Sequence, residues 1–128
     1  MALKSILKSD VRVREAANKA FQSMQLGLDT GRFAVTLVQT ALKRIEFDSS
    51  KLPAQLRPRL KFDNDTRPGF QWGPFFIADD ERQGRIYGGD THTAVVRFQR
   101  QAGLDIDGKA GINTLTRLDK ILHFVENH

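Results

Sequence analysis

Apolar residues recur at intervals of three and four in four stretches of the chain, and this spacing puts them on one face of an α-helix. The predicted helices cover residues 10–26, 33–45, 90–102 and 112–125. Their apolar stripes are formed by Val13, Ala16, Ala17, Ala20, Phe21 and Met24, by Val35, Val38, Leu42 and Ile45, by Ala94, Val95, Phe98 and Ala102, and by Leu115, Leu118, Leu122 and Val125. The pattern therefore predicts a mainly α fold.

Residues that commonly begin and end helices stand at the edges of these stretches. Side-chain oxygens that can accept from free N–H groups of a first turn precede or open three of them. They belong to Ser9 or Asp10, to Asp90 and Thr91, and to Asn113 and Thr114. Gly27 and Gly103 follow the last apolar positions of the first and third stretches, where a left-handed residue often stops a helix.

Residues 47–88 follow a different pattern, and this segment is long for an unstructured connection. Leu60 and Phe62 alternate with charged residues before a turn-forming run at 64–69, and Phe70 and Trp72 alternate after it. Such alternation around a turn is typical of a β-hairpin. Prolines, which disfavour helix interiors, stand at positions 53, 58, 68 and 74. We expect a small β-hairpin-type insertion.

A motif is repeated before the third and fourth stretches. Gly88-Gly89-Asp90-Thr91 and Gly111-Ile112-Asn113-Thr114 each place a glycine three residues ahead of a threonine that opens an apolar stripe. Asp107-Gly108, a turn signal, precedes the second copy by three residues. We expect both helices to begin through the same local structure.

From Thr91 to Leu118 the chain reads T-x-x-A-V-x-x-F-Q-x-x-x-G-L-x-x-D-G-x-x-G-x-x-T-L-x-x-L. This string resembles the C-terminal half of the peptidoglycan-binding domain family, a small three-helix module found on many bacterial cell-wall hydrolases. Val35-x-x-Val38-Gln39-x-x-Leu42 resembles the opening of that module. Where the family has D-G-x-[FY]-G-x-x-T, this chain keeps Tyr87, Gly88 and Thr91, but Gly84 and Arg85 replace Asp-Gly.

The resemblance implies a three-helix bundle built from residues 33–45, 90–102 and 112–125. The predicted organisation is an N-terminal helical extension at 1–32 and a peptidoglycan-binding-like domain at 33–128, with the insertion at 47–88 between its first two core helices. A chain of 128 residues without cysteine is long enough for such a fold without a disulfide framework.

Six residues are candidates for ligand contact. Sugar faces stack on aromatic rings, so Tyr87 and Trp72 are candidates, although Trp72 could equally fill a core. Arg97 and Arg100 could meet wall carboxylates. Gln99 could line a groove or bond backbone groups in the core. Asp107 belongs to the family's D-G turn, and holding that turn is favoured over direct ligand contact.

No arrangement typical of an enzyme appears in the sequence. The histidines at 92, 123 and 128 lack zinc-ligand spacing, no G-x-S-x-G motif is present, and no glutamate stands in a glycosidase-like motif. The interpretation is a non-enzymatic protein with no catalytic residues, no metal and no cofactor.

The resemblance implies non-catalytic binding of peptidoglycan, through a stem peptide and its adjoining sugar, as a targeting or anchoring module. The alternative is a component or cargo of a phage-like contractile injection or type VI-type machine that binds a protein partner through the 47–88 insertion and the N-terminal helix. The formal charge of +5 favours anionic partners, but the basic residues are dispersed, and nucleic-acid binding ranks last.

Targeting signals give a further expectation. The first eight residues, Met1-Ala2-Leu3-Lys4-Ser5-Ile6-Leu7-Lys8, contain no long apolar stretch and no small-residue cleavage site. We therefore expect no Sec-type signal and no membrane span, with delivery to the periplasm or cell wall by a secretion or phage-like machine.

Overall fold

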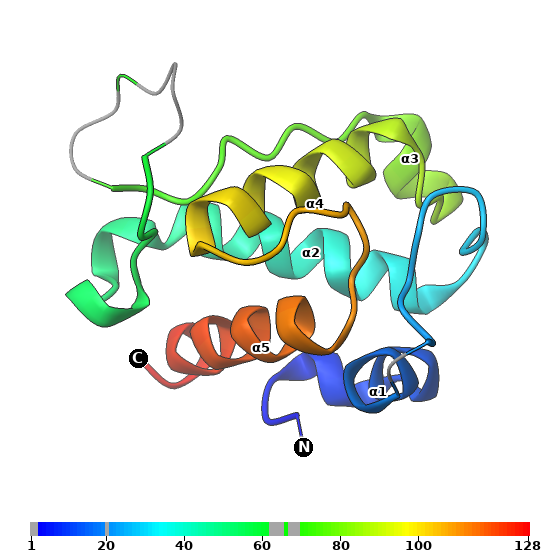
Figure 1. Ribbon diagram of the computed structural model, residues 1–128, viewed down its shortest axis with the longest axis horizontal. Coiled ribbons are helices and arrows are strands. Elements are labelled where there is room, and N and C mark those ends of the chain that lie inside the picture. The colour runs from blue at the N-terminus through cyan, green and yellow to red at the C-terminus, as the bar shows by residue number, and fades with distance from the viewer. Residues whose placement is uncertain (1–2, 20, 62–65, 67–69) are drawn as a thin grey trace.

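The computed structural model of the protein describes residues 3–19, 21–61, 66 and 70–128. Its helices are α1 (Val11–Asn18), α2 (Phe33–Phe47), α3 (Asp79–Gly84), α4 (Gly89–Ala102) and α5 (Ile112–Asn127), with short 3-10 helices η1 (Ile6–Ser9), η2 (Ser49–Lys51) and η3 (Ala54–Leu56). Helix α2 crosses the middle of the molecule with α4 above it and α5 below it, and α1 lies beside the start of α5 (Figure 1).

The three predicted core helices are confirmed as α2, α4 and α5. Helix α2 is two residues longer than predicted, and α4 ends at Ala102 because Gly103 takes the left-handed backbone, with φ of 73°. The predicted caps of α4 and α5 are wrong by a few residues, since the N-cap positions are Gly88 and Gly111. Glycine at these positions lets another segment approach the start of each helix.

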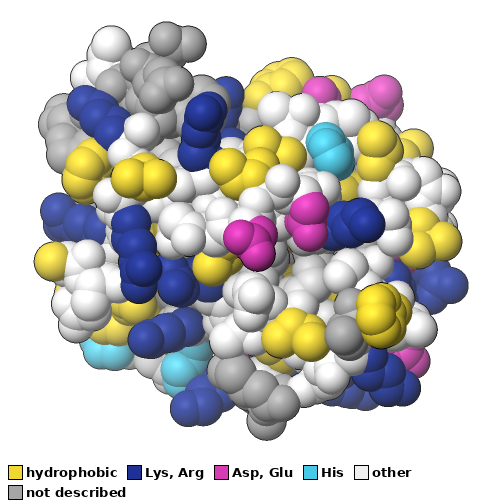
Figure 2. All heavy atoms as spheres, viewed as in Figure 1, with side chains coloured by type: hydrophobic (Ala, Val, Ile, Leu, Met, Phe, Trp, Pro, Cys, Tyr) yellow, Lys and Arg dark blue, Asp and Glu magenta, His cyan; other side chains and the backbone are white. Residues whose placement is uncertain are grey.

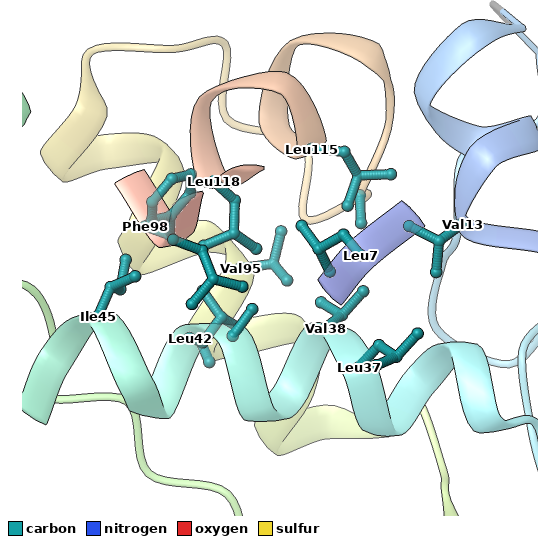
Figure 3. Packing of buried hydrophobic residues seen from close by; sticks show 14 of the residues in the cluster. Leu7, Val13, Leu37, Val38, Leu42, Ile45, Val95, Phe98, Leu115 and Leu118 are labelled. Carbon is teal, nitrogen blue, oxygen red and sulfur yellow. The ribbon is translucent and has the colours of Figure 1, made fainter. Parts of the chain in front are cut away.

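The apolar stripes of the three helices meet in one core. Figure 3 shows Leu42 and Ile45 of α2 facing Phe98 of α4 and Leu118 of α5. Leu7 of η1 and Val13 of α1 belong to the same buried cluster. Burial of apolar surface at about 25 cal/mol per Å² is the main stabilising contribution to such a bundle, and the N-terminal segment contributes to it.

The predicted helix at 10–26 is confirmed only to Asn18. Asp10 caps it as expected, accepting a 2.8 Å bond from the backbone N–H of Arg12. Beyond Asn18 the prediction is wrong, because the Met24 backbone exchanges two hydrogen bonds with Ala110, at 3.0 and 2.8 Å. Tertiary pairing therefore replaces two helical turns, and Phe21 of the predicted stripe is 98% exposed. Ala20 of that stripe lies outside the described residues.

The predicted β-hairpin insertion is wrong for the part of the segment that the structure describes. There the chain forms η2, η3, an extended stretch and α3, and the described residues contain no strand beyond two isolated bridges, Met24 with Ala110 and Thr30 with Ile86. Phe62 and the turn residues Asn64, Asp65, Arg67, Pro68 and Gly69 of the predicted hairpin lie outside the described residues.

Side chains of the helices take the hydrogen bonds that a partner strand would have made. The N–H of Trp72 donates to Ser49 Oγ at 3.0 Å, and that of Gly73 donates to Gln101 Oε1 at 2.8 Å. The N–H of Phe75 donates to Glu46 Oε1 at 3.0 Å. Because these backbone groups are satisfied in this way, the alternation of Phe70 and Trp72 belongs to an extended strap over α2 and α4.

The N-terminal segment is fixed to α5 by a buried carboxylate. Asp119 accepts from the N–H of Lys4 at 3.0 Å, from the N–H of Ser5 at 2.8 Å and from Ser5 Oγ at 2.6 Å. Glu126 accepts from the N–H of Ile6 at 2.9 Å. The segment before α1 therefore packs on the helix that ends the chain.

The repeated sequence motif corresponds to a repeated structure. Gln39 of α2 donates through Nε2 to Thr91 Oγ1 at 2.9 Å and to the Ile86 carbonyl at 3.1 Å. One helix later, Gln99 of α4 donates through Nε2 to Thr114 Oγ1 at 2.9 Å and to the Lys109 carbonyl at 3.0 Å. Helices α2 and α4 thus each use one glutamine to hold the start of the next core helix, α4 and α5 respectively.

The backbone confirms the equivalence of the two copies. The N-cap glycines Gly88 and Gly111 have nearly the same conformation, with φ/ψ of −100°/−161° and −111°/−159°. Arg85, which stands where the second copy has Gly108, adopts the same left-handed region, with φ of 55° against 73°. The departure from Asp-Gly in the first copy therefore leaves the turn in place, with a non-glycine residue in a conformation that costs about 1 kcal/mol or more.

Candidate functional site

Trp72 is a core residue. Its side chain is 1% exposed, its ring stacks on Phe98 with centroids 4.9 Å apart, and its Nε1–H donates to the Leu56 carbonyl at 3.0 Å. Of the two roles predicted for Trp72, filling the core is the one that this placement fits. A sugar would need an exposed ring face, and none is left.

Tyr87 is also buried, at 0% exposure. Its hydroxyl donates a 2.6 Å hydrogen bond to the Gly108 carbonyl, and its N–H donates to the Asp29 carbonyl at 3.0 Å. Burial, with the negative charges of Asp107 and Asp29, raises the pKa of the phenol well above its ordinary value. The ring therefore joins the start of α4 to the α4–α5 connection and is not available for stacking on a ligand.

Gln99 organises the connection between α4 and α5. Besides its bonds to Thr114 and Lys109, its Nε2 donates to Asp107 Oδ1 at 2.9 Å. Its Oε1 accepts from the N–H of Asp107 at 3.1 Å and of Gly108 at 2.9 Å. These contacts match one of the two roles predicted for Gln99, the bonding of backbone groups. The residue also lines the hollow described below.

Asp107 holds the predicted turn and remains accessible. Its Oδ1 accepts from the Lys109 N–H at 2.9 Å and from Gln99, which is the turn-holding role favoured by the sequence. The residue is nevertheless exposed. Asp107 can both fix the turn and attract a cation.

The two arginines lie elsewhere on α4. Arg97 is half-buried and donates through Nη1 to the Pro74 carbonyl, beside the exposed ring of Phe76. Arg100 is exposed in the last turn of the helix. The six predicted residues therefore do not form one site, and only Gln99 and Asp107 are brought together.

A polar hollow lies where the α4–α5 connection meets the start of α5. Its volume is about 220 Å³. It is lined by Ser23, Gln99, Leu104, Asp105, Asp107, Lys109, Gly111, Ile112, Asn113 and Thr114. Figure 2 shows acidic side chains near the middle of this face, over the α4–α5 connection, with a basic side chain beside them. The hollow therefore offers both signs of charge to a ligand.

The first turn of α5 opens into this hollow. Its N-cap, Gly111, has no side chain, and no side chain of the described residues accepts from the amides of Asn113 or Thr114. Ser23 lies against Gly111, where an added Cβ would fall 2.3 Å from Ser23 Oγ. Unsatisfied N–H groups and the helix dipole make such a start attractive to an anion.

The equivalent start of α4 is closed by a carboxylate of the chain itself. Glu81 accepts from the N–H groups of Gly88, Asp90 and Thr91, at 3.1, 2.8 and 3.0 Å, and from Thr91 Oγ1 at 2.9 Å. Partial burial opposes its charge, but the bonds from Thr91, Asp90 and Gly88 outweigh this and lower the pKa of Glu81. Sequence analysis missed this role, because nothing in the acidic run Asp79-Asp80-Glu81 indicates which N–H groups its side chains accept from.

The sequence reading also missed most of the residues that line the hollow. Asp105 and Lys109 flank the Asp107-Gly108 turn, and that closeness is the signal that could have found them. Ser23 carries no such signal, because its place depends on the pairing of Met24 with Ala110. Asn113 was expected only as a helix cap.

Two further surveys of the described residues bear on function. In them, no group of three or more histidine, cysteine, aspartate or glutamate side chains is placed to hold a metal ion. None of their helices has the length and apolar character needed to cross a membrane.

Comparison with known proteins identifies one family. Residues 75–118 match the family model described as "Putative peptidoglycan binding domain". No curated protein and no solved structure matches the chain. The matched stretch contains α3, α4, the α4–α5 connection and the first turns of α5, and every residue that lines the hollow except Ser23. This stretch of the chain is therefore similar to a peptidoglycan-binding domain, and it supplies most of the lining of the hollow.

Proposed function

We propose that this protein is a non-catalytic peptidoglycan-binding module that holds a wall stem peptide in the hollow at the start of α5. The observation that carries the proposal is the difference between the two structural copies. Glu81 occupies the start of α4, whereas the equivalent start of α5 is open. A ligand carboxylate at α5 would make the bonds that Glu81 makes at α4.

The charges around the hollow fit a peptide that carries both signs. Lys109 and the first turn of α5 favour a carboxylate, such as the free C-terminus of a stem peptide. Asp105 and Asp107 are both exposed at the hollow and favour an ammonium group, such as a diamino-acid side chain. The hollow is small and open, so one module binds weakly and attachment or repetition raises the effective affinity.

The carboxylate is tested with a soluble muropeptide that has a free C-terminal carboxylate and with its C-terminal amide. We expect the free acid to bind and the amide to bind about tenfold more weakly, because charge-assisted hydrogen bonds are the stronger ones. Lys109→Gln should weaken binding of the free acid and leave binding of the amide nearly unchanged. Equal binding of acid and amide would remove the assignment to α5.

A matched pair of variants tests the equivalence with Glu81. Leu104 precedes Gly111 by seven residues, as Glu81 precedes Gly88, and it lines the hollow. Leu104→Glu should place a carboxylate of the chain at α5 and abolish muropeptide binding while the fold is retained. The Leu104→Gln variant, whose new side chain has the same size as glutamate but no charge, should lose far less of its muropeptide binding. Retention of binding by the glutamate variant would count against the proposal.

A second candidate function is binding to a protein of a phage-like contractile injection or type VI-type machine, which would also deliver the chain to the wall. The observation that favours it is the exposure of large apolar side chains near both predicted interface segments, with Phe21 at 98% and Phe47 at 83%. Figure 2 shows hydrophobic side chains at the right of this face, over the α1–α2 connection. Exposed apolar patches often mark interaction sites.

The gene's surroundings test this second candidate. Neighbouring genes for tail-sheath or baseplate proteins, with co-elution of the purified chain and one of those proteins, would support it. We expect Phe21→Ala to disrupt that co-elution while muropeptide binding is unchanged. A gene with no such neighbours would leave the candidate without a partner.

A further inference from the structure

Basic side chains gather between the C-terminal end of α4 and α5 on the face shown in Figure 2. Two arginines lie near the last residues of α4. Arg117 of α5 donates through Nη1 to the Ala102 carbonyl at 3.2 Å. The Cδ of Arg59 lies 3.5 Å from the position that a Cβ on Gly103 would take. Both side chains therefore reach the same end of the helix.

The backbone holds this arrangement in place. The N–H groups of Arg59 and Leu60 both donate to the Gln101 carbonyl, at 2.7 and 3.1 Å. The Gln101 side chain is buried against the strap, where its Nε2 donates to the Gly73 carbonyl at 2.9 Å. The position of Arg59 thus follows from the contacts of Arg59, Leu60 and Gly73 with Gln101 of α4.

The positive charges of Arg59 and Arg117 lie close enough to interact, and the described residues supply neither with an acidic partner. Burial, and then the positive charge of Arg59, lowers the pKa of Arg117. Among the described residues, neither arginine forms an ion pair with a carboxylate. The helix dipole favours a cation at the C-terminal end of α4. Arg117 takes this role, since it already donates to the Ala102 carbonyl. The side chain of Arg59 has no hydrogen bond within the described residues and is exposed.

We propose that Arg59 and Arg117 form a site for the phosphate group of a phosphodiester-linked polyol polymer, of the kind that accompanies peptidoglycan in cell walls. The choice of a wall polymer rests on the proposed function, whereas the phosphate site rests on the arginine pair. Two guanidinium forks can share the several oxygens of a phosphate, while one fork already saturates a carboxylate. Lys120, exposed one turn after Arg117, extends the surface for a neighbouring phosphate.

The chemistry of the cluster favours a polymer without bases over nucleic acid. Binding of single strands combines basic grooves with aromatic side chains on which bases stack. The chain neighbours of the two arginines are Pro58, Leu60, Thr116 and Leu118. None of these four residues has an aromatic ring, and the rings of Trp72 and Phe98, which pack near this end of α4, are buried.

A titration with a poly(glycerol phosphate) oligomer at low salt tests the proposal. We expect the unmodified chain to bind and Arg59→Gln and Arg117→Gln each to weaken binding about tenfold. The matched control removes the same charge elsewhere, through Lys8→Gln and Lys19→Gln, two exposed residues of the otherwise packed N-terminal segment. The melting temperature of each variant is measured alongside, and Arg59→Gln remains decisive if Arg117→Gln unfolds.

Three results would overturn the inference: no binding by the folded chain, equal losses in the lysine controls, or tighter binding of an oligothymidylate of the same length. Muropeptide binding is followed in the same samples. Arg59→Gln should leave it unchanged, and Leu104→Glu should leave polymer binding unchanged. If the polymer binds through the arginine pair while the muropeptide does not bind, the proposed function fails and the phosphate site stands.

Discussion

The hydroxyl of Tyr87 donates a 2.6 Å hydrogen bond to the carbonyl of Gly108, and both groups are buried. This bond links the first structural copy to the turn of the second, next to the hollow proposed for the ligand. With the bonds of Gln99, it is one of the contacts through which the core sets the shape of the α4–α5 connection.

Removing that hydroxyl should destabilise the protein without removing the ring. Tyr87→Phe leaves the Gly108 carbonyl buried and unsatisfied, and we expect a loss of about 1–3 kcal/mol in the free energy of unfolding. Urea unfolding followed by circular dichroism measures it. An unchanged midpoint and slope would show that the bond contributes nothing. Tyr87 was a candidate for stacking on a sugar from the sequence alone, whereas its burial makes stability the property that it should control.

The same residue gives a spectroscopic prediction, because it is the single tyrosine of the chain. Its folded-state pKa is raised above the ordinary 10.0, so the native state holds the phenol proton more tightly than the unfolded state does. Stability from this residue is full below pH ~10 and falls as the pH rises above it. We expect phenolate absorbance to appear only as the protein unfolds. Ionisation near pH 10 with a native spectrum would contradict the buried placement.

Replacing Glu81 should weaken the start of α4. We expect Glu81→Gln to lower the free energy of unfolding at neutral pH by about 1 kcal/mol, the size found for helix caps. The folded pKa of Glu81 is lowered, so its contribution is present above the ordinary value of 4.5 and is lost as the pH falls through the folded value. The free energy of unfolding of the variant should therefore decrease less than that of the unmodified chain as the pH is lowered.

Glu15→Gln is the matched control for Glu81→Gln. The Glu15 side chain lies on α1 and makes no hydrogen bond or ion pair with the described residues. Chemical unfolding of both variants between pH 3 and 7 compares them directly. Equal shifts would mean that Glu81 acts through net charge alone and not as a cap.

A pair of phenylalanines separates core from surface. Phe98 is fully buried between Trp72 and Phe75, whereas Phe21 is almost fully exposed. We expect Phe98→Ala to cost about 3–5 kcal/mol of stability, as for other large buried aromatics, and Phe21→Ala to change it by less than about 0.5 kcal/mol. Thermal melts and the fluorescence of Trp72, the single tryptophan, report both. Comparable melting temperatures would refute the core shown in Figure 3.

How far the sequence predicted the structure depends on whether the signal was local. The stripes of α2, α4 and α5 were correct because a 3.6-residue period is a property of each helix alone. The stripe through Phe21 and Met24 failed because Met24 pairs with Ala110, and the sequence does not indicate that partner. The stretch with Phe70 and Trp72 is extended, but Phe70 is exposed while Trp72 is buried, and side chains such as Gln101 satisfy its backbone in place of a second strand.

The candidate site shows the same division. Asp107 could be found from its D-G turn, and the role of Gln99 as a backbone partner was among the alternatives. The closure of α4 by Glu81 and the opening at α5 could not be found, since they appear only when the two copies are compared in three dimensions.

By itself, the sequence determined the three core helices, the repeated glycine–threonine motif and the resemblance to a wall-binding family, because each of these is encoded within a short window of residues. Only the tertiary structure decided which aromatic rings are buried and which helix start is open. Burial and hydrogen-bond satisfaction depend on residues far apart in the chain, such as Tyr87 and Gly108 or Ser23 and Gly111, that folding alone brings into contact.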